Sequence, residues 1–381
     1  MFKRNIILLW GIALLQGMVF YAPVATLYRQ AAGLGIFHIT LIESISLWLI
    51  ICLEIPWGWA ADRIGYRKTM LCCCGIYFIS KIVFWQAEGF CGFLLERILL
   101  SIVCAGISGV DSTMLYLSCG EGKSHWAFSI YESLGQAGLL LSAGIYALWV
   151  GDNYRLAAFL TVLSYGTAAI LSLGLREISV EAGREPGKSP ASIWTVLKRQ
   201  LSNPSLVMLL LAVGLFNESH QTITVYLSQL QYVRAGMNPA QISLAYILVN
   251  VLALMGGLSA RLSNRLGSKA MGIGLLVLAS ISCLVMGLFP FPVLSVLSVM
   301  MLRACFGLMQ PLQMELQNRT FTGKDRATAL SVNAVILDGM GIFLNLLYGA
   351  VAQTRLDFAL YLGAALCAVG AVLYRKAVSA F

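Results

Sequence analysis

Charged residues are scarce in this sequence. They make up 11% of its 381 residues, whereas hydrophobic residues make up 59%; ordinary soluble domains carry about 25% charged residues. A soluble core of this length would need a charged shell, which 26 Lys and Arg with 17 Asp and Glu cannot supply. The bilayer is therefore the better solvent for most of this surface. Because backbone groups in lipid must bond internally, we expect the long apolar runs to be helices.

Sequence patterns for catalysis are also absent. The chain has no HExxH motif, P-loop, GxSxG motif or dinucleotide-binding fingerprint. We therefore expect neither ATP-driven transport nor enzyme activity. Three rival classes of membrane protein are still considered: a membrane-embedded enzyme, which this absence disfavours, a lipid scramblase and a non-transporting receptor. The ten cysteines form no CxxC pair and no Cys/His metal spacing. They are expected to pack as small hydrophobes, with no disulfide, metal or cofactor.

Long apolar segments separated by short polar breaks are the main feature that is present. Twelve of them approach the roughly 20 residues that a helix needs to cross the hydrocarbon core. The predicted spans are 5–28, 39–61, 67–87, 90–118, 127–150, 155–175, 205–231, 240–262, 269–288, 292–316, 327–351 and 356–375. The expected fold is thus an all-α integral membrane protein with twelve transmembrane helices.

Positive charge is distributed unevenly between the loops. Nineteen of the 26 Lys and Arg fall at the termini and in one set of loops, four fall in the opposite loops, and Lys81, Arg97 and Arg303 lie inside predicted helices. Loops rich in Lys and Arg face the cytoplasm, so we expect a multi-pass protein of the inner (plasma) membrane with both termini cytoplasmic. The same rule explains the formal charge of +9. The expected partners are the lipid bilayer and a small solute rather than a nucleic acid, and a monomer is the default.

The two halves of the chain resemble each other weakly. Residues 1–175 and 205–381 each hold six predicted spans, and residues 176–204 between them read as a cytoplasmic linker. The segment 62–67 after the second span, DRIGYR, corresponds to the segment 264–269 after the eighth, NRLGSK, 202 positions later. Parallel repeats of this kind occur in membrane transport proteins. Apolar residues at 193, 196, 197 and 201 predict a short helix in the linker, either interfacial on the inner leaflet or an ordinary linker helix.

The segment after the second span carries a family signature. Residues 58–68 read GWAADRIGYRK and resemble the loop between helices 2 and 3 of the major facilitator superfamily, in which Gly, three residues, Asp, a basic residue, any residue, Gly, any residue and two basic residues follow one another. The resemblance implies a major facilitator fold of two six-helix pseudo-repeats. It also implies an inner gate, whose residues here are Gly58, Asp62, Arg63, Gly65, Arg67 and Lys68.

The residue types in this signature suit such a gate. Gly58 permits close helix approach, Gly65 permits a tight turn, and a carboxylate such as that of Asp62 is favoured at the N-terminus of a neighbouring helix. In the family that neighbour is helix 11, which Arg326 begins here. The alternative is that the basic residues only set the topology.

Two further segments resemble the drug-export-like bacterial branch of the superfamily. They are residues 53–58, LEIPWG, and residues 326–331, RATALS. The fifth span departs from that branch, because residues 135–144 lack the Gly-Pro and paired glycines of its antiporter motif. The direction of exchange is therefore open.

Ionisable groups in the C-terminal half mark a candidate solute or proton site. Such groups are costly inside a bilayer and usually face a cavity or a partner. Glu218, near the middle of the seventh span, lies in the most polar patch of any span, with Asn217 and Gln221 on a shared face; Arg303 and Asp338 lie at similar depth. The alternative is a structural ion pair of Arg303 with Glu218 or Asp338, and His220 is more readily explained by packing than as a proton relay.

The N-terminal half offers a second group of candidates. Glu43 and Glu54 lie eleven residues apart on the second span, close to three helical turns, and Asp111 and Glu132 lie toward the inner ends of the fourth and fifth. Inner-gate salt bridges are an equal alternative to coupling roles for Asp111 and Glu132. Gln16, in the middle of the first span, is a candidate polar contact.

The expected function is secondary active transport by alternating access. The branch resemblance and the embedded carboxylates favour proton-coupled efflux of an amphipathic small molecule. Proton- or ion-coupled uptake of a nutrient or organic anion is the alternative, with Arg303 as the anion contact.

Overall fold

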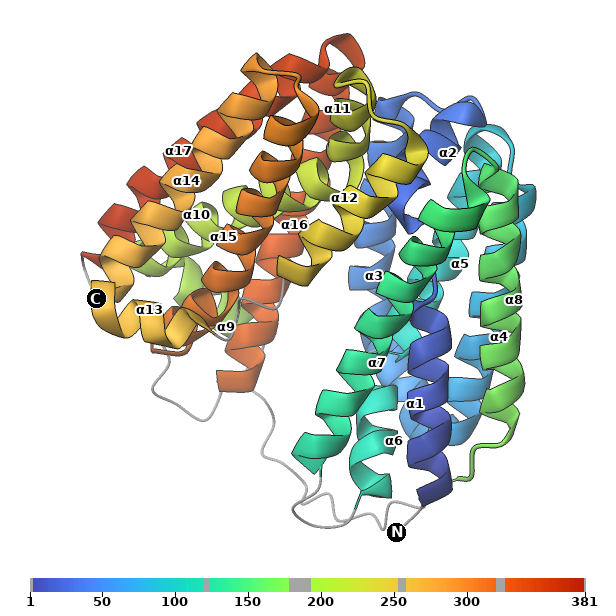
Figure 1. Cartoon of the computed structure of the whole chain (residues 1–381). Helices are drawn as coiled ribbons and strands as arrows, with labels where there is room; N and C mark the ends of the chain where they lie inside the picture. Colours follow the sequence, from blue (N-terminus) through green and yellow to red (C-terminus); the bar gives the residue numbers. More distant parts are fainter. Residues whose placement is uncertain are drawn as a thin grey trace. The chain divides into compact units, whose positions relative to one another are not determined.

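The computed structural model describes residues 3–107, 109–119, 124–177, 193–252, 258–319 and 326–379, which form helices joined by short turns (Figure 1). No strand occurs in these ranges, so the all-helical prediction is confirmed there. Side chains at 55, 58–62, 125, 193–196, 319 and 326–328 also lie outside the described set.

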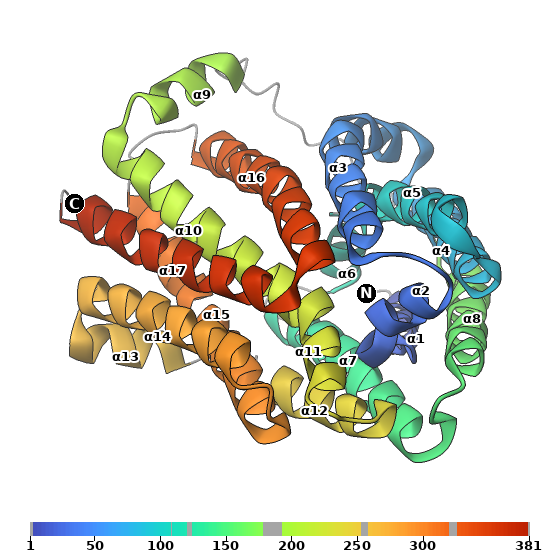
Figure 2. The same ribbon diagram turned by 90° about the horizontal axis from the view of Figure 1, so that it is seen from above.

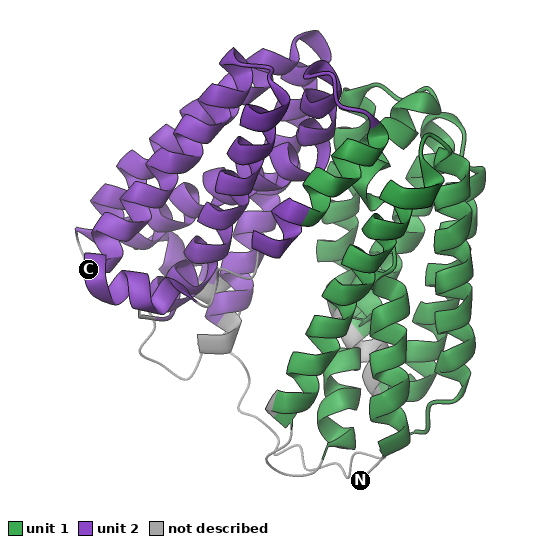
Figure 3. Cartoon of the chain, viewed as in Figure 1, with its two compact units in different colours: residues 1–183, 239–247 green, residues 184–238, 248–381 purple. Residues whose placement is uncertain are grey.

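The helices group into two compact units (Figure 3). Unit 1 comprises Met1–Gly183 and Pro239–Ile247, and unit 2 comprises Arg184–Asn238 and Leu248–Phe381. Residues 178–192 are outside the described set. The predicted boundaries at 175 and 205 therefore stay a prediction.

Unit 1 is built from α1 to α8 and the N-terminal part of α12 (Pro239–Val251), and two of its predicted spans, 5–28 and 90–118, are each divided between two helices. Its first predicted span is a helix, α1, that ends at Gly17 and resumes as a 3₁₀ turn at Ala22–Val24 and the short helix α2. Its elements are α1 (Lys3–Gly17), α2 (Ala25–Ala31), α3 (Ile36–Ile64), α4 (Tyr66–Gln86), α5 (Gly89–Ile107), α6 (Val110–Ser118), α7 (Ser124–Ile145), a π-helical turn (Tyr146–Val150) and α8 (Tyr154–Leu173).

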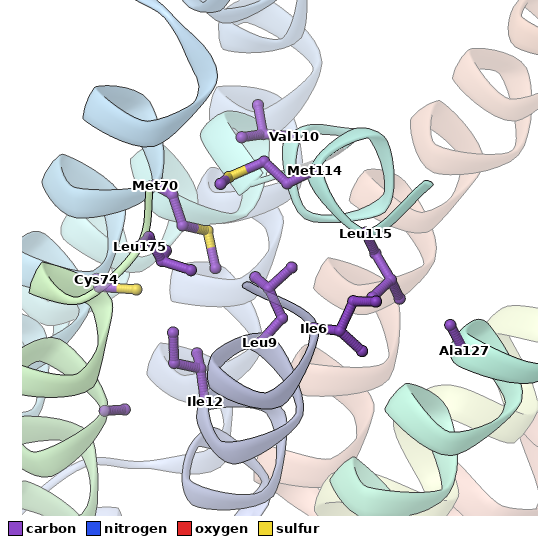
Figure 4. Close-up of a cluster of buried hydrophobic side chains, with 11 residues drawn as sticks. Ile6, Leu9, Ile12, Met70, Cys74, Val110, Met114, Leu115, Ala127 and Leu175 are labelled. Atoms are coloured by element: carbon purple, nitrogen blue, oxygen red, sulfur yellow. The ribbon is translucent and has the colours of Figure 1, made fainter. Parts of the chain in front are cut away.

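The core of unit 1 surrounds α1. Ile6, Leu9 and Ile12 of this helix are almost fully buried and meet Met70 of α4 and Met114 of α6 (Figure 4). The 3- and 4-residue spacing of apolar positions along α1 places them on one face. Burial of these apolar side chains against α4 and α6 therefore stabilises α1 at the centre of the unit, where it also contacts α7 and α8.

Unit 2 is built from the remaining helices, including the C-terminal part of α12. Its elements are α9 (Ile193–Leu201), α10 (Pro204–Thr222), a π-helical turn (Ile223–Leu227), α11 (Ser228–Arg234), α12 (Pro239–Val251), α13 (Ser259–Leu266), α14 (Ser268–Leu288), α15 (Pro292–Arg319), α16 (Arg326–Thr354) and α17 (Leu356–Val378). Helix α10 begins where it does because Asn203 Oδ1 accepts from the backbone N–H groups of Ser205 and Leu206 at 3.1 and 3.3 Å, and because Pro204, at the first helical position, has no N–H group that would need an acceptor.

Helix α10 is the element that positions the polar groups of unit 2. It lies beside α16 and α17 (Figure 2) and also contacts α15. A Cβ at Gly370 of α17 would lie 3.2 Å from the carbonyl oxygen of Ala212, so α10 and α17 approach closely at this glycine. The polar patch of α10 is therefore held within a closely packed set of helices.

The short helix predicted in the linker is confirmed as α9, and it is docked on α16. Gln200 Nε2 donates to the Ala329 carbonyl oxygen at 2.8 Å, and Leu197 packs against Ala329 and Val332. Lys198 and Arg199 point outward from the same helix. This docking explains why α9 is helical despite its length of nine residues.

Eleven helices are long and apolar enough to cross a membrane, among the residues described. They correspond to eleven of the twelve predicted spans. Helix α12, at the eighth predicted span, is a shorter apolar helix, and residues 253–257 after it lie outside the described set. The count of twelve and the cytoplasmic termini stay predictions. Large apolar side chains such as Trp149, Phe343 and Leu148 are 77%, 75% and 74% exposed, which suits a surface covered by lipid.

Candidate functional site

The candidate site of unit 2 begins on the last two turns of α10. Glu218, Ser219 and Thr222 lie there, directly before the π-helical turn at Ile223–Leu227. A π turn adds one residue to a helical turn and is frequent at functional sites. The polar residues and the irregular turn therefore coincide.

One face of this patch contacts α16 through hydrogen bonds between side chains. Thr222 Oγ1 donates to Asn345 Oδ1 at 2.8 Å, and Asn345 Nδ2 lies 3.4 Å from Glu218 Oε2. Tyr348 OH donates to Ser219 Oγ at 2.7 Å. The amide group of Asn345 thus bonds two side chains of α10: its nitrogen donates to the half-buried Glu218 carboxylate, and its oxygen accepts from Thr222.

A glycine makes room for this carboxylate. A Cβ at Gly341 would lie 2.7 Å from Glu218 Oε1, which is closer than real Cβ contacts. Asp338, Gly341 and Asn345 recur at helical spacing on α16 and so share one face. Asp338 is half-buried, and the structure places it on the face that meets Glu218.

The other face of the patch contacts α15. Asn217 Nδ2 lies 3.4 Å from Gln313 Oε1, and Gln313 Nε2 donates to Gln310 Oε1 at 2.7 Å. Three amide side chains therefore form a chain that links α10 to α15. Gln221, predicted to share the face of Asn217, is exposed.

Arg303 is placed against a buried histidine and an aromatic ring. Its Nη1 lies 3.5 Å from His220 Nε2, and its guanidinium lies 5.8 Å from the centre of the Phe306 ring. His220 is fully buried and stacks on Phe306 with ring centres 3.9 Å apart. His220 and Glu218 therefore face different neighbouring helices, as the spacing of two residues along α10 predicts.

In unit 1, Gln16 lies at the end of α1, one residue before the helix stops. Its Nε2 lies 3.5 Å from Cys74 Sγ, and its backbone carbonyl accepts from Tyr165 OH at 2.6 Å. The offset of 202 residues that relates Asp62 to Asn264 also relates Gln16 to Glu218. The two candidate contacts thus occupy equivalent places in the two repeats.

The carboxylates predicted in unit 1 are not gathered in one place. Glu43 forms an ion pair with Arg97, with their side chains 13% and 20% exposed. Asp111 Oδ2 accepts from Tyr131 OH at 3.0 Å and its Oδ1 accepts from the Ser112 N–H at 2.6 Å.

Glu54 and Glu132 are both exposed. Glu43 therefore has a charged partner, Asp111 has neutral donors, and the other two carboxylates are on the surface of the unit.

One buried ion pair in unit 1 is absent from the sequence-based candidates. Lys81 Nζ lies 3.4 Å from Glu96 Oε1, and the two side chains are 5% and 1% exposed. Lys81 also donates to Tyr21 OH at 3.1 Å. The presence of Lys81 within an apolar span was visible in the sequence, but nothing in the sequence identified its partners.

The described residues of the signature secure the start of α4. Gly65 has φ of +97°, a conformation that favours glycine. The Arg67 N–H donates to Glu177 Oε1 at 3.2 Å, and Arg67 Nε donates to the Leu175 carbonyl oxygen at 2.7 Å. This part of the signature therefore ties the start of α4 to the segment after α8.

The other signature residues contribute less to this contact. Arg63 and Lys68 are exposed, while the side chain of Asp62 and the surroundings of Gly58 are outside the described set. The inner-gate role stays a prediction.

Unit 1 also contains a recess of about 700 Å³. Tyr28, Glu88, Tyr154 and Arg155 line it, at the connections between helices. Arg155 Nη2 donates to Glu88 Oε1 at 2.7 Å across it, and both side chains are exposed. We place the candidate site at the buried groups near the middle of the spans rather than here, because ionisable groups within a span are costly and usually mark a functional site.

No group of three or more His, Cys, Asp or Glu side chains suited to a metal ion occurs in the part of the chain that the structure describes. The ten cysteines are free thiols.

One comparison with known proteins identifies a family. The model of the Major Facilitator Superfamily matches residues 7–345. No curated protein matches the sequence.

Solved structures share the fold at low sequence identity. A mutant form of the nucleoside transporter NupG is 14% identical, with a TM-score of 0.86 over 98% of this chain and 99% of that one. A D-xylose-proton symporter is 15% identical, with a TM-score of 0.73 over 98% and 96%. An auto-inhibited peptide transporter of the POT family is 14% identical, with a TM-score of 0.77 over 100% and 97%.

The match over most of the chain, the helical fold and the buried polar groups within membrane-length helices agree with one another. They indicate a multi-pass membrane transporter for a small molecule and not an enzyme. The chain belongs to the major facilitator superfamily.

Proposed function

We propose that this protein takes up a small, polar, largely uncharged solute of nucleoside or sugar type, coupled to the movement of protons. The observation that carries the proposal is the set of amide side chains beside Glu218. Asn345 of α16 donates to that carboxylate, and Asn217, the preceding residue of α10, begins a chain of amides with Gln313 and Gln310 of α15. Amides both donate and accept hydrogen bonds, which suits hydroxyl and heterocycle groups better than an apolar cation.

Glu218 is the proposed proton carrier. When ionised, its carboxylate only accepts hydrogen bonds; when protonated, it also donates one. Asn345 Nδ2, 3.4 Å from Glu218 Oε2, is a donor suited to the ionised form. Binding a proton would weaken that contact and free the carboxyl group to bond the solute, so proton and solute would be bound together.

The names of two structural neighbours suggested the solute type and the proton coupling of this proposal. They are described as a nucleoside transporter and a D-xylose-proton symporter, the second with proton coupling in its name. Their low identity extends only the fold to this chain, so substrate and direction rest on the proposal.

Efflux of an amphipathic molecule is the second candidate function. The segments 53–58 and 326–331, which resemble the drug-export-like branch, favour it. The amide-rich site favours the polar solute.

The test is solute uptake by reconstituted vesicles with an imposed proton gradient, using radiolabelled uridine and xylose and a fluorescent cationic dye. We expect uridine or xylose to accumulate with the gradient and Glu218→Gln to abolish accumulation, while counterflow of the solute continues. Glu315→Gln, which changes an exposed carboxylate of α15, is the matched control. Proton-driven movement of the dye alone would refute the proposal and support efflux.

A further inference from the structure

The interruption of the first transmembrane helix is bonded to α8. Helix α1 ends at Gly17, so nearby backbone groups lose their partners within the helix. Ser164 Oγ donates to the Leu15 carbonyl oxygen and Tyr165 OH donates to the Gln16 carbonyl oxygen, both at 2.6 Å. In lipid, irregular backbone is tolerated only where it finds such partners or lines a water-filled cavity.

A third bond completes this arrangement on the other side of the break. The Phe20 N–H donates to Thr161 Oγ1 at 3.0 Å. Residues 161, 164 and 165 lie on one face of α8 by helical spacing. A single face of α8 therefore satisfies backbone groups on both sides of the interruption.

Lys81 of α4 lies against the same break. Its Nζ donates to Tyr21 OH at 3.1 Å and lies 5.3 Å from the ring centres of Tyr77 and Tyr165. An ammonium group over aromatic faces is stabilised by the ring quadrupoles. Lys81 thus contacts both Tyr21, at the far end of the interruption, and Tyr165, which binds the near end.

Glu96 carries the charge that pairs with the Lys81 ammonium group. Its Oε1 is 3.4 Å from Lys81 Nζ, and its Oε2, buried as well, has no hydrogen-bond partner among the described residues. Buried charges are costly unless paired. Glu96 therefore balances the charge of Lys81, but the shorter contact of the Lys81 ammonium group is with Tyr21, at 3.1 Å, rather than with Glu96, at 3.4 Å.

We propose that Lys81 is a positioning residue for solute binding, which holds the interruption of the first helix through Tyr21 and Tyr165 and thereby sets the orientation of Gln16. This inference rests on the proposed function and on the prediction from the sequence that Gln16 is a polar contact for the solute. The repeat supports it, because the offset that relates Gln16 to Glu218 also relates Tyr21 to Ile223, the first residue of the π-helical turn in unit 2. In each unit a helix irregularity thus follows the candidate contact, over residues 18–24 after Gln16 and over Ile223–Leu227 after Glu218.

Hydrogen exchange of the full-length protein in lipid nanodiscs tests the structural part of the inference without a substrate. Tyr21→Phe removes the hydroxyl that Lys81 binds but keeps the ring. Lys81→Met combined with Glu96→Gln removes both charges, which avoids leaving Glu96 ionised and alone. Tyr116→Phe is the control, because it removes the hydroxyl of an exposed tyrosine of α6 in the same unit and leaves the three rings around Lys81 unchanged.

We expect at least fivefold faster exchange in peptides covering residues 16–24 for Tyr21→Phe and for the double variant, with peptides of α14 unchanged, and no change at 16–24 for Tyr116→Phe. Unchanged exchange at 16–24 in both variants would overturn the inference. If the double variant does not fold, Tyr21→Phe decides alone.

Transport kinetics in proteoliposomes test the link to binding. With radiolabelled uridine, we expect KM to rise at least fivefold for Tyr21→Phe while the maximal rate per folded protein stays within twofold, since a merely structural role would lower the amount of folded protein instead. Faster exchange with an unchanged KM would overturn the role in solute binding. If wild-type protein moves neither uridine nor xylose, the proposed function fails, and the exchange experiment still decides whether Lys81 holds the interruption.

Discussion

The crossing of α1 and α7 gives the sharpest prediction, because glycines bring two backbones together there. A Cβ added at Gly138 of α7 would lie 2.2 Å from the Leu14 carbonyl oxygen and 3.2 Å from the backbone carbon of Gly17. A Cβ at Gly17 would in turn lie 2.2 Å from the Gly135 carbonyl oxygen. Backbone atoms cannot rotate away as a side chain would, so Gly138→Ala must push α1 and α7 apart.

The magnitude follows from two opposing terms. Contact distances near 3.4 Å are ordinary for a Cβ, so the helices must separate by about 1 Å, and overpacking of this kind typically costs about 1–3 kcal/mol. Replacing Gly by Ala inside a helix stabilises it by up to about 1 kcal/mol. Gly144→Ala on the same helix gains that propensity without the clash, because nothing lies within 4 Å of its added Cβ. Relative to Gly144→Ala, Gly138→Ala should therefore be less stable by about 1–3 kcal/mol.

Thermal unfolding in detergent, followed by a thiol-reactive dye, measures this difference. The buried cysteines Cys73, Cys74 and Cys283 become reactive only when the helices separate. We expect Gly138→Ala to unfold several degrees below wild type and Gly144→Ala at or above it. Equal unfolding temperatures for the two variants would refute the close crossing of α1 and α7.

Two further predictions concern the site and the signature. Gly341→Ala should displace the Glu218 carboxylate and reduce proton-driven uptake at least tenfold. The unfolding temperature should change little, because the clashing atom is the end of a side chain. Gly339→Ala, whose added Cβ meets nothing within 4 Å, should leave uptake unchanged, and equal uptake by both variants would contradict the packing of Glu218 on α16. Arg67→Ala should lower the free energy of unfolding by about 1–3 kcal/mol, because it removes the charged hydrogen bond to the Leu175 carbonyl oxygen. Lys68 is exposed, so Lys68→Ala should change that free energy by less than about 0.5 kcal/mol. Dye-monitored unfolding in detergent compares the two variants, and an equal effect would assign both residues to topology alone.

Hydrophobicity along the chain determined most of the architecture. Runs such as 269–288 and 356–375 correspond closely to α14 and α17, because the cost of placing a segment in lipid is a sum over its own residues and needs no partner. The signature around Gly65 likewise identified the family, since a positive φ and a tight turn are local demands that restrict the residue type.

The helix irregularities and the pairing of polar groups were decided only by the tertiary structure. Lys81 and Glu96 are 15 residues apart on different helices, and nothing in either span indicates that the two side chains face each other. Gln313 and Asn345 were likewise unmarked, because a neutral amide in a span has the same hydropathy whether it meets Glu218 or lipid. The rotation and register of packed helices determine which groups meet, and these depend on contacts among several helices at once, such as the glycines where α1 crosses α7.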